Sequence, residues 1–107
     1  MSPSQSPKAK IKAYLSLAAK AGKLVLGQEA IIQAAQTKRA VLLLLDELAG
    51  KNSADRIKRL ATYHEIPLLL VEDLGKGIGR QGAIAAALQD KGLGGVILML
   101  AGQEEPN

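Results

Sequence analysis

The residues best suited to chemistry are lysines that flank a glycine turn near the N-terminus. Lys20 and Lys23 lie on either side of Gly22, and Gly27 follows after three apolar residues. The pattern indicates a basic helix end, a short strand, a glycine turn and the start of a second helix. The free N–H groups and the positive dipole of a helix start favour an anion. With the nearby lysines they form a site suited to a phosphate backbone, without any catalytic group.

Positive charge is concentrated in the N-terminal half of the chain, whose net charge is +4. Residues 1–50 hold seven Lys/Arg and three Asp/Glu, whereas residues 51–107 hold seven of each. Such a bias indicates either a polyanionic partner or a solubilising surface. Charge alone does not separate these two interpretations.

A glycine-rich segment, residues 77–82, matches the dinucleotide-binding pattern G-x-G-x-x-G. In dinucleotide-binding domains this pattern directly follows a strand, opens a helix and precedes an acidic residue at a strand end. Here five residues separate Val71, the end of an apolar run, from Gly77, and no such acidic residue follows in place. We interpret the segment as a loop whose glycines adopt positive φ.

The composition gives little support for a metal site or for nucleophilic catalysis. The chain has no cysteine and one histidine, His64, which excludes disulfides, cysteine nucleophiles and a histidine-based metal cluster. Acid pairs, Asp46-Glu47 and Glu72-Asp73, follow two apolar runs, where carboxylates can act in catalysis. With no partner nearby in sequence, we interpret them as helix caps or turn residues. We expect no catalytic residue, no metal and no cofactor.

Hydrophobic periodicity predicts helices that alternate with strands. A helix is predicted from residue 8 to near residue 22, a short strand over residues 24–26 and a second helix from residue 27. The apolar run over residues 40–45 is typical of a strand covered on both faces. The positions of the second helix expected to face the core are Ile31, Ala34 and Ala35.

A third helix is predicted from its cap and its end. Asn52 or Ser53 is expected at the N-cap, with Asp55 in a capping-box-like spacing. The helix must end by Ile66, because Pro67 disfavours α geometry at the preceding residue.

The C-terminal third is less clear from propensity. A buried strand is predicted over residues 68–71 and a glycine-rich loop over residues 73–82. Propensity alone favours a helix over the alanine-rich residues 83–88, and a strand over residues 93–100, which contain Val96-Ile97. Strands that alternate with helices predict a layered α/β domain.

The length of 107 residues, with 48% apolar residues, fits one domain. Residues 1–7, rich in Ser and Pro, are predicted to be a disordered tail, residues 8–102 the domain and residues 103–107 a C-terminal tail. We find no secretory signal or membrane-spanning stretch, and the lack of cysteine is compatible with a reducing cytoplasm. We expect a cytoplasmic monomer with no membrane partner.

Several short motifs occur in an order that resembles one family. They are residues 19–28, the apolar run into Leu45-Asp46-Glu47, the helix at Asn52, Ile66-Pro67 and Leu74-Gly75. Across residues 11–100 this order resembles the ribosomal L-seven-Ae/L-thirty-e superfamily, and within it the bacterial YlxQ-type ribosomal-protein-like branch. The resemblance implies an α/β fold, a three-layer α/β/α sandwich with a four-stranded mixed sheet. It also implies that residues 83–88 form the last strand and that residues 93–100 lie in the last helix.

The resemblance implies RNA binding, typically to kink-turns, through two surfaces. The first is the helix start after the first strand, with the family pattern Gly-x-Asn-Glu-x-x-Lys. Gly27 matches the glycine, whereas Glu29, Ala30 and Gln33 stand where the pattern has Asn, Glu and Lys. Three polar RNA contacts are therefore altered, and one base-reading pair is worth about 1–3 kcal/mol.

The second surface is an apolar loop after the third strand, which in the family packs on extruded bases. The loop retains Leu74-Gly75 and adds Lys76, Ile78 and Arg80. We therefore expect a non-enzymatic, ribosome-associated protein that binds kink-turn or other structured RNA. Together with the basic turn, the predicted RNA-binding residues are Lys20, Lys23, Gly27, Gln28, Glu29, Gln33, Leu74, Gly75, Lys76, Ile78 and Arg80. Two alternatives stay open: a protein–protein adaptor on the same fold, and a nucleotide-handling enzyme that uses residues 77–82.

Overall fold

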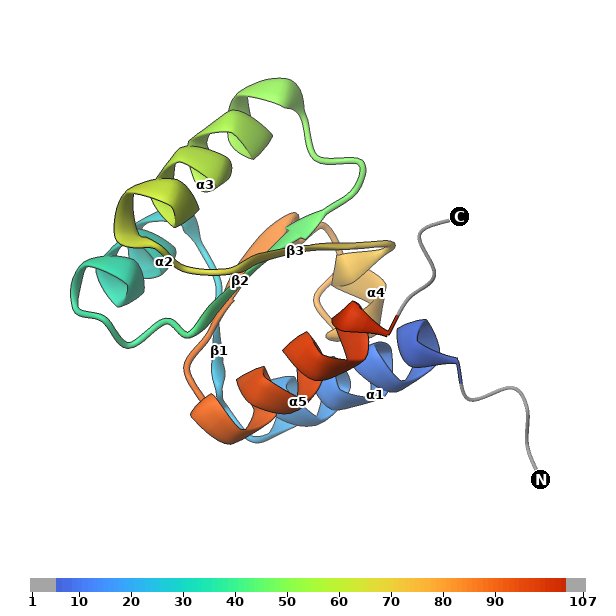
Figure 1. The fold of residues 1–107 in the computed structure, drawn as a ribbon. Coiled ribbons are helices and arrows are strands. Elements are labelled where there is room, and N and C mark those ends of the chain that lie inside the picture. Colours follow the sequence, from blue (N-terminus) through green and yellow to red (C-terminus); the bar gives the residue numbers. More distant parts are fainter. Residues whose placement is uncertain (1–5, 104–107) are drawn as a thin grey trace.

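Five helices and four strands make up the described part of the chain, which the computed structural model gives as residues 6–103. Figure 1 shows how they follow one another along the chain. In order they are α1 (Pro7–Lys20), β1 (Leu24–Val25), α2 (Gln28–Gln36), β2 (Leu42–Asp46), α3 (Lys51–His64), β3 (Leu68–Val71), α4 (Leu74–Gly77), β4 (Ala85–Leu88) and α5 (Lys91–Gly102).

The strands form one mixed sheet in the order β1-β4-β2-β3. β2 and β3 are parallel, and β4 is antiparallel to both of its neighbours. α1 and α5 lie side by side on one face of the sheet, with the short α4, whereas α2 and α3 cover the other face (Figure 1). The predicted three-layer α/β/α sandwich with a four-stranded mixed sheet is confirmed.

The centre of the sheet is β2, whose leucines are buried on both faces. Leu42 and Leu44 pack in the cluster beneath α1 and α5, whereas Leu43 and Leu45 pack in the cluster beneath α2 and α3. All four are 0–1% exposed. Successive side chains of a strand point to opposite faces, so both faces need apolar residues where helices cover both. The prediction of a doubly covered strand is confirmed.

The start of α3 differs from the prediction. Gly50, and neither Asn52 nor Ser53, occupies the N-cap, and no side chain caps this helix. Asp55 does not complete a capping box but pairs with Lys51, with 3.1 Å between Oδ2 and Nζ. Glycine is tolerated at an N-cap, and an oppositely charged pair one turn apart supports the first turn.

The strand predicted over residues 68–71 is confirmed as β3, but the prediction that it is buried is wrong, because β3 lies at the edge of the sheet. Leu70 is 52% exposed, and Leu68 and Leu69 are half-buried. Among the described strands, β3 pairs with β2 alone, which leaves its other side without a neighbour. A short apolar run does not by itself distinguish an edge strand from a central one.

Propensity favours a helix over residues 83–88 and a strand over residues 93–100, but the structure has the strand β4 and the helix α5 there. This is the assignment that the family resemblance implied. Ala86 and Ala87 of β4 are 1% and 0% exposed, in the middle of the sheet. α5 approaches the sheet closely at Gly94, where a Cβ atom would lie 2.9 Å from Cγ2 of Val41. Small residues therefore allow β4 to lie in the middle of the sheet and α5 to pack closely against it.

The ends of the domain extend beyond the predicted boundaries. Pro7 is the first residue of α1, and the Ser6 side chain caps this helix by accepting a hydrogen bond from the Ala9 N–H at 3.2 Å. Gln103 occupies the C-cap of α5. The remainder of the two predicted tails, residues 1–5 and 104–107, lies outside the described residues. Over residues 6–103, no helix has the length and apolar character needed to cross a membrane.

Candidate nucleic-acid interface

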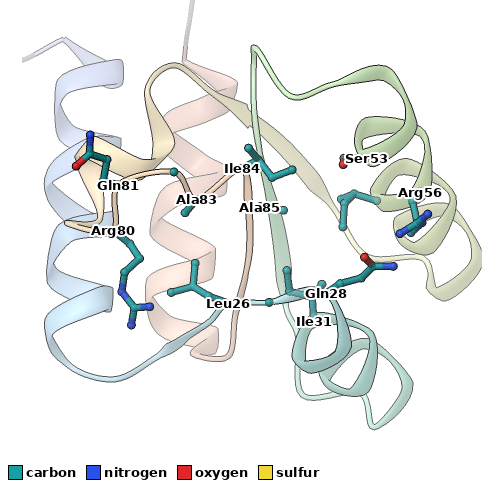
Figure 2. A pocket seen from close by; sticks show the side chains of 13 residues that line it. Leu26, Gln28, Ile31, Ser53, Arg56, Arg80, Gln81, Ala83, Ile84 and Ala85 are labelled. Atoms are coloured by element: carbon teal, nitrogen blue, oxygen red, sulfur yellow. The ribbon is translucent and has the colours of Figure 1, made fainter.

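A groove of about 480 Å³ opens between α2, α3 and the segment that leads from α4 into β4. Figure 2 shows side chains from these separate parts of the chain around it. We call it the first groove, and it is lined by residues 26–28, Ile31, Ser53, Arg56, Ile57 and residues 80–85.

The start of α2 forms one end of the first groove. Gly27 is the N-cap of α2 and has φ +91°, a conformation that L side chains rarely adopt. No side chain caps the helix. The N–H groups of its first turn have no acceptor within the helix, and they carry the positive end of its dipole. Exposed Gln28 follows directly, so this helix start presents hydrogen-bond donors at the groove.

Asp46, at the end of β2, fixes the segments that form the opposite wall. Its Oδ1 accepts a hydrogen bond from the Leu74 N–H and its Oδ2 accepts one from the Leu48 N–H, both at 2.8 Å. The backbone N–H of Asp46 also donates to the Ile84 carbonyl at 2.8 Å. This acid therefore anchors a turn, the start of α4 and the groove wall.

Gly75 allows the loop over residues 80–83 to pack directly on α4. A Cβ atom at Gly75 would lie 2.7 Å from the carbonyl oxygen of Arg80 and 3.2 Å from the nitrogen of Ala83. The carbonyl of Gly75 accepts a hydrogen bond from the Arg80 N–H at 2.8 Å. The absence of a side chain at Gly75 thus sets the position of the wall that carries Arg80.

Gly75→Ala is expected to lower the free energy of unfolding by about 1–3 kcal/mol, because the added methyl group would overpack against backbone atoms. Gly77→Ala is the matched control, since it lies in the same short helix and a Cβ atom there meets nothing within 4 Å. Urea denaturation followed by circular dichroism measures both variants against the parent. Equal stability of the two variants would show that the close approach at Gly75 does not constrain the loop.

Positive charge flanks the first groove on both sides. Figure 2 shows Arg80 on one side, Ser53 and Arg56 on the other, and Leu26 and Gln28 between them. None of the described residues that line the groove carries a carboxylate. Its apolar lining consists of Leu26, Ile31, Ile57, Ala83, Ile84 and Ala85. An apolar floor between guanidinium groups suits a planar base with its phosphates.

Of the predicted site residues, Gly27, Gln28 and Arg80 meet in the first groove. Glu29 and Gln33 are exposed on α2 but do not line it. They are one helical turn apart, so they share a face of α2. The structure thus brings together the helix start and the loop that the family resemblance implied, at a groove that the sequence did not reveal.

The predicted lysines lie outside the first groove. Lys20 is exposed at the end of α1, and Lys23 is exposed in the turn that leads to β1. Lys76 is exposed on α4. None of the three lines the groove, so they can act on an anion there only through longer-range attraction.

The prediction of an apolar loop that packs on bases is wrong for Leu74, Gly75 and Ile78. Leu74 is 0% and Ile78 is 8% exposed, and both belong to the core cluster beneath α1 and α5. Gly75 is buried beneath the loop described above. α4 is a helical turn that directs these residues inward. The exposed apolar residue of this region is Ile84, which is 40% exposed and lines the first groove.

From the sequence, Arg56 and Lys58-Arg59 of α3 are interpreted as a solvated helix face, with binding as the less favoured alternative. Ser53, Arg56 and Ile57 line the first groove, and none of them is among the predicted RNA-binding residues. The available signal was their spacing, because positions three and four residues apart on a helix share a face. Exposed Arg56 beside buried Ile57 marks the edge between the core and the groove.

The G-x-G-x-x-G segment forms a turn that leads into a strand. Gly77 ends α4, and Gly79 and Gly82 have φ +73° and +88°. The next element is β4, whereas a dinucleotide fingerprint opens a helix. The interpretation of residues 77–82 as a loop with positive φ is confirmed at Gly79 and Gly82.

This α/β/α sandwich places the chain among ribosomal-type α/β proteins. Residues 9–94 match the model of the Ribosomal protein L7Ae/L30e/S12e/Gadd45 family, and the chain belongs to this family. The family inferred from the sequence motifs is confirmed. As a member of this family, the chain is non-enzymatic.

The chain is similar to the RNA-binding protein YlxQ of Bacillus subtilis (strain 168). The two are 33% identical over 89 residues, which cover 80% of this chain and 89% of that protein. This likeness supports the YlxQ-type branch inferred from the sequence.

Two solved structures share the fold. One is a protein of unknown function from Bacillus halodurans, with a TM-score of 0.83, 26% identity and coverage of 89% of this chain and 99% of that one. The other is the Giardia lamblia 15.5kD RNA binding protein, with a TM-score of 0.72, 13% identity and coverage of 96% of each chain. At that identity, the second structure shows the fold alone.

Proposed function

We propose that this chain is a ribosomal-protein-like RNA-binding protein that holds structured RNA in the first groove. The observation that carries the proposal is the pair of arginines, Arg56 and Arg80, on opposite sides of a groove without carboxylates (Figure 2). The uncapped start of α2 adds backbone donors at the same place. The similarity to a protein named as RNA-binding points in the same direction.

The proposed binding mode uses each part of the first groove. An unpaired base enters between α2 and the loop before β4 and rests against Ile84, which is apolar and 40% exposed. Arg56 and Arg80 contact the phosphates on either side, where charge-assisted hydrogen bonds are strongest. Gln28 and the first-turn N–H groups of α2 complete the contact. A kink-turn supplies the combination of extruded bases and bent backbone that such a groove fits.

The proposed cellular setting is the ribosome or an RNA of similar structure in the cytoplasm, bound by a single copy of the chain. The first groove lies within one chain, between α2, α3 and the segment that leads into β4. A second copy is therefore not required to complete it.

Salt dependence of RNA binding tests the proposal. Contacts to about three to five phosphates should give a slope of about −2 to −4 for log K against log salt. Fluorescence anisotropy with a labelled kink-turn RNA, titrated at several salt concentrations, measures this slope. An affinity that does not change between low and physiological salt would contradict the proposal. Protein partners retained from cells in high salt would instead favour an adaptor on this fold.

The double variant Lys20→Ala with Lys23→Ala is expected to weaken RNA binding by about threefold, because exposed charges outside the groove act through screened attraction. Their exposure predicts a change in unfolding free energy within about 0.5 kcal/mol. The matched control, Lys8→Ala with Lys10→Ala, removes the same charge from exposed positions at the other end of α1. Filter binding compares the two variants. Equal binding by both would show that the basic turn makes no local contribution.

A further inference from the structure

A second groove, of about 330 Å³, runs between α2 and α3. It adjoins the first groove, because Gln28, Arg56 and Ile57 line both. From this shared end it extends along α3 past Arg59 to Tyr63. The two grooves therefore lie next to each other, the first at the loop before β4 and the second between the outer helices.

The chemistry of the second groove suits a nucleic acid. Arg56 and Arg59 are its charged residues, and none of the described residues that line it carries a carboxylate. Over residues 6–103, the salt bridge in the structure joins Lys51 to Asp55, so neither arginine is neutralised by an acid. An unneutralised pair of guanidinium groups complements phosphate.

Tyr63 lies at the far end of this groove and has an unusual position for an aromatic ring. Its side chain is 81% exposed, so core packing does not account for it. Its ring meets that of His64 edge-on, with 4.9 Å between centroids and an interplanar angle of 84°. A T-shaped contact can cover only one face of the Tyr63 ring, so His64 leaves at least the other face free. A free aromatic face is what a base stacks on in single-stranded recognition.

We infer that the second groove binds a single-stranded extension of the RNA held in the first groove, with Arg59 on its phosphates and Tyr63 stacked on one of its bases. Arg56, Arg59 and Tyr63 are spaced by three and four residues, so they follow one face of α3. The rise from Arg56 to Tyr63 is about 10 Å, which matches roughly three stacked nucleotides at about 3.4 Å each. This inference rests on the proposed function.

The test uses the full chain and two forms of one kink-turn RNA. One form is blunt, and the extended form carries six unpaired uridines at each end. The parent is expected to bind the extended form about tenfold tighter than the blunt form, given the usual value of one stacked base. The double variant Arg59→Ala with Tyr63→Ala is expected to lose this advantage to within about twofold and to keep its affinity for the blunt RNA. Tyr63→Phe should retain most of the advantage, because stacking needs the ring and not the hydroxyl.

Lys58→Ala is the matched control, because it removes an exposed cation from the same helix outside the second groove. It should preserve the preference for extended RNA. A second readout is the fluorescence of Tyr63→Trp, which introduces a single tryptophan into a chain that has none. Its emission should change with extended RNA and not with blunt RNA.

The outcomes separate this inference from the proposed function. Equal affinity of the parent for blunt and extended RNA would overturn the inference and leave the proposed function standing. Equal losses on both RNAs in the Arg59/Tyr63 double variant would overturn it as well. Failure to bind either RNA would overturn the proposed function and the inference together. A protein partner whose binding depends on Tyr63 while extended RNA gains nothing would assign the groove to that partner.

Discussion

The double variant Arg56→Ala with Arg80→Ala should bind structured RNA about a hundredfold more weakly than the parent. Each arginine is proposed to make a charge-assisted contact to phosphate, and a hydrogen bond to a charged group is worth about 1.5–3 kcal/mol. Loss of two phosphate contacts should also make the slope of log K against log salt less negative by about two. Both side chains are exposed, so the fold should be retained.

The control for this prediction is Lys58→Ala with Lys91→Ala, which removes the same net charge from exposed positions outside both grooves. Fluorescence anisotropy across a salt series gives the affinity and the slope, and circular dichroism verifies the fold. If the control loses as much affinity as Arg56→Ala with Arg80→Ala, binding depends on net charge and not on the first groove. A groove variant that binds like the parent would refute the proposed binding mode.

Restoring the family pattern on α2 should increase kink-turn affinity at least about tenfold, which corresponds to about 1.4 kcal/mol. The changes are Glu29→Asn, Ala30→Glu and Gln33→Lys. Glu29 and Gln33 are exposed on α2, and Ala30 is half-buried, so the helix can carry the new side chains on its surface. Replacing Glu29 removes a carboxylate that repels phosphate, and Asn and Glu can both read base edges.

The comparison RNA for the restoration is a straight duplex at matched salt. A gain on the kink-turn alone would indicate that α2 reads its bases. Equal gains on both RNAs would mean that the substitutions added only electrostatic attraction. No gain from a folded triple variant would mean that residues 27–33 do not face RNA, and the adaptor interpretation would then be favoured.

Several elements were predictable from the sequence because local signals and tertiary packing agree. The four consecutive leucines of β2 predict a strand that is covered on both faces, and all four are buried in the structure. In α2, Ile31, Ala34 and Ala35 follow helical spacing, and all three are buried. Pro67 stops α3 before β3, since α3 ends at His64.

The secondary structure of the last strand, β4, and of the last helix, α5, was not predictable from propensity, because it depends on tertiary packing against other segments. Ala86 and Ala87 pair with Leu44 and Leu43 in the centre of the sheet, where burial between two helical layers outweighs the helical preference of alanine. In α5, Gly94 permits contact with Val41 despite the weak helix propensity of glycine. The family motifs supplied the assignment that local preference missed.

By itself, the sequence determined the family, the alternation of helices and strands, and the glycine turn at Gly27. Those features depend on local spacing and on motif order along the chain. Only the tertiary structure decided which residues share a groove, because Gln28, Arg56 and Arg80 come from separate segments of the chain that the fold brings together. It also decided that Leu74 faces the core and Ile84 faces outward. Apolar side chains near a loop look alike in sequence, and their exposure follows from what packs over them.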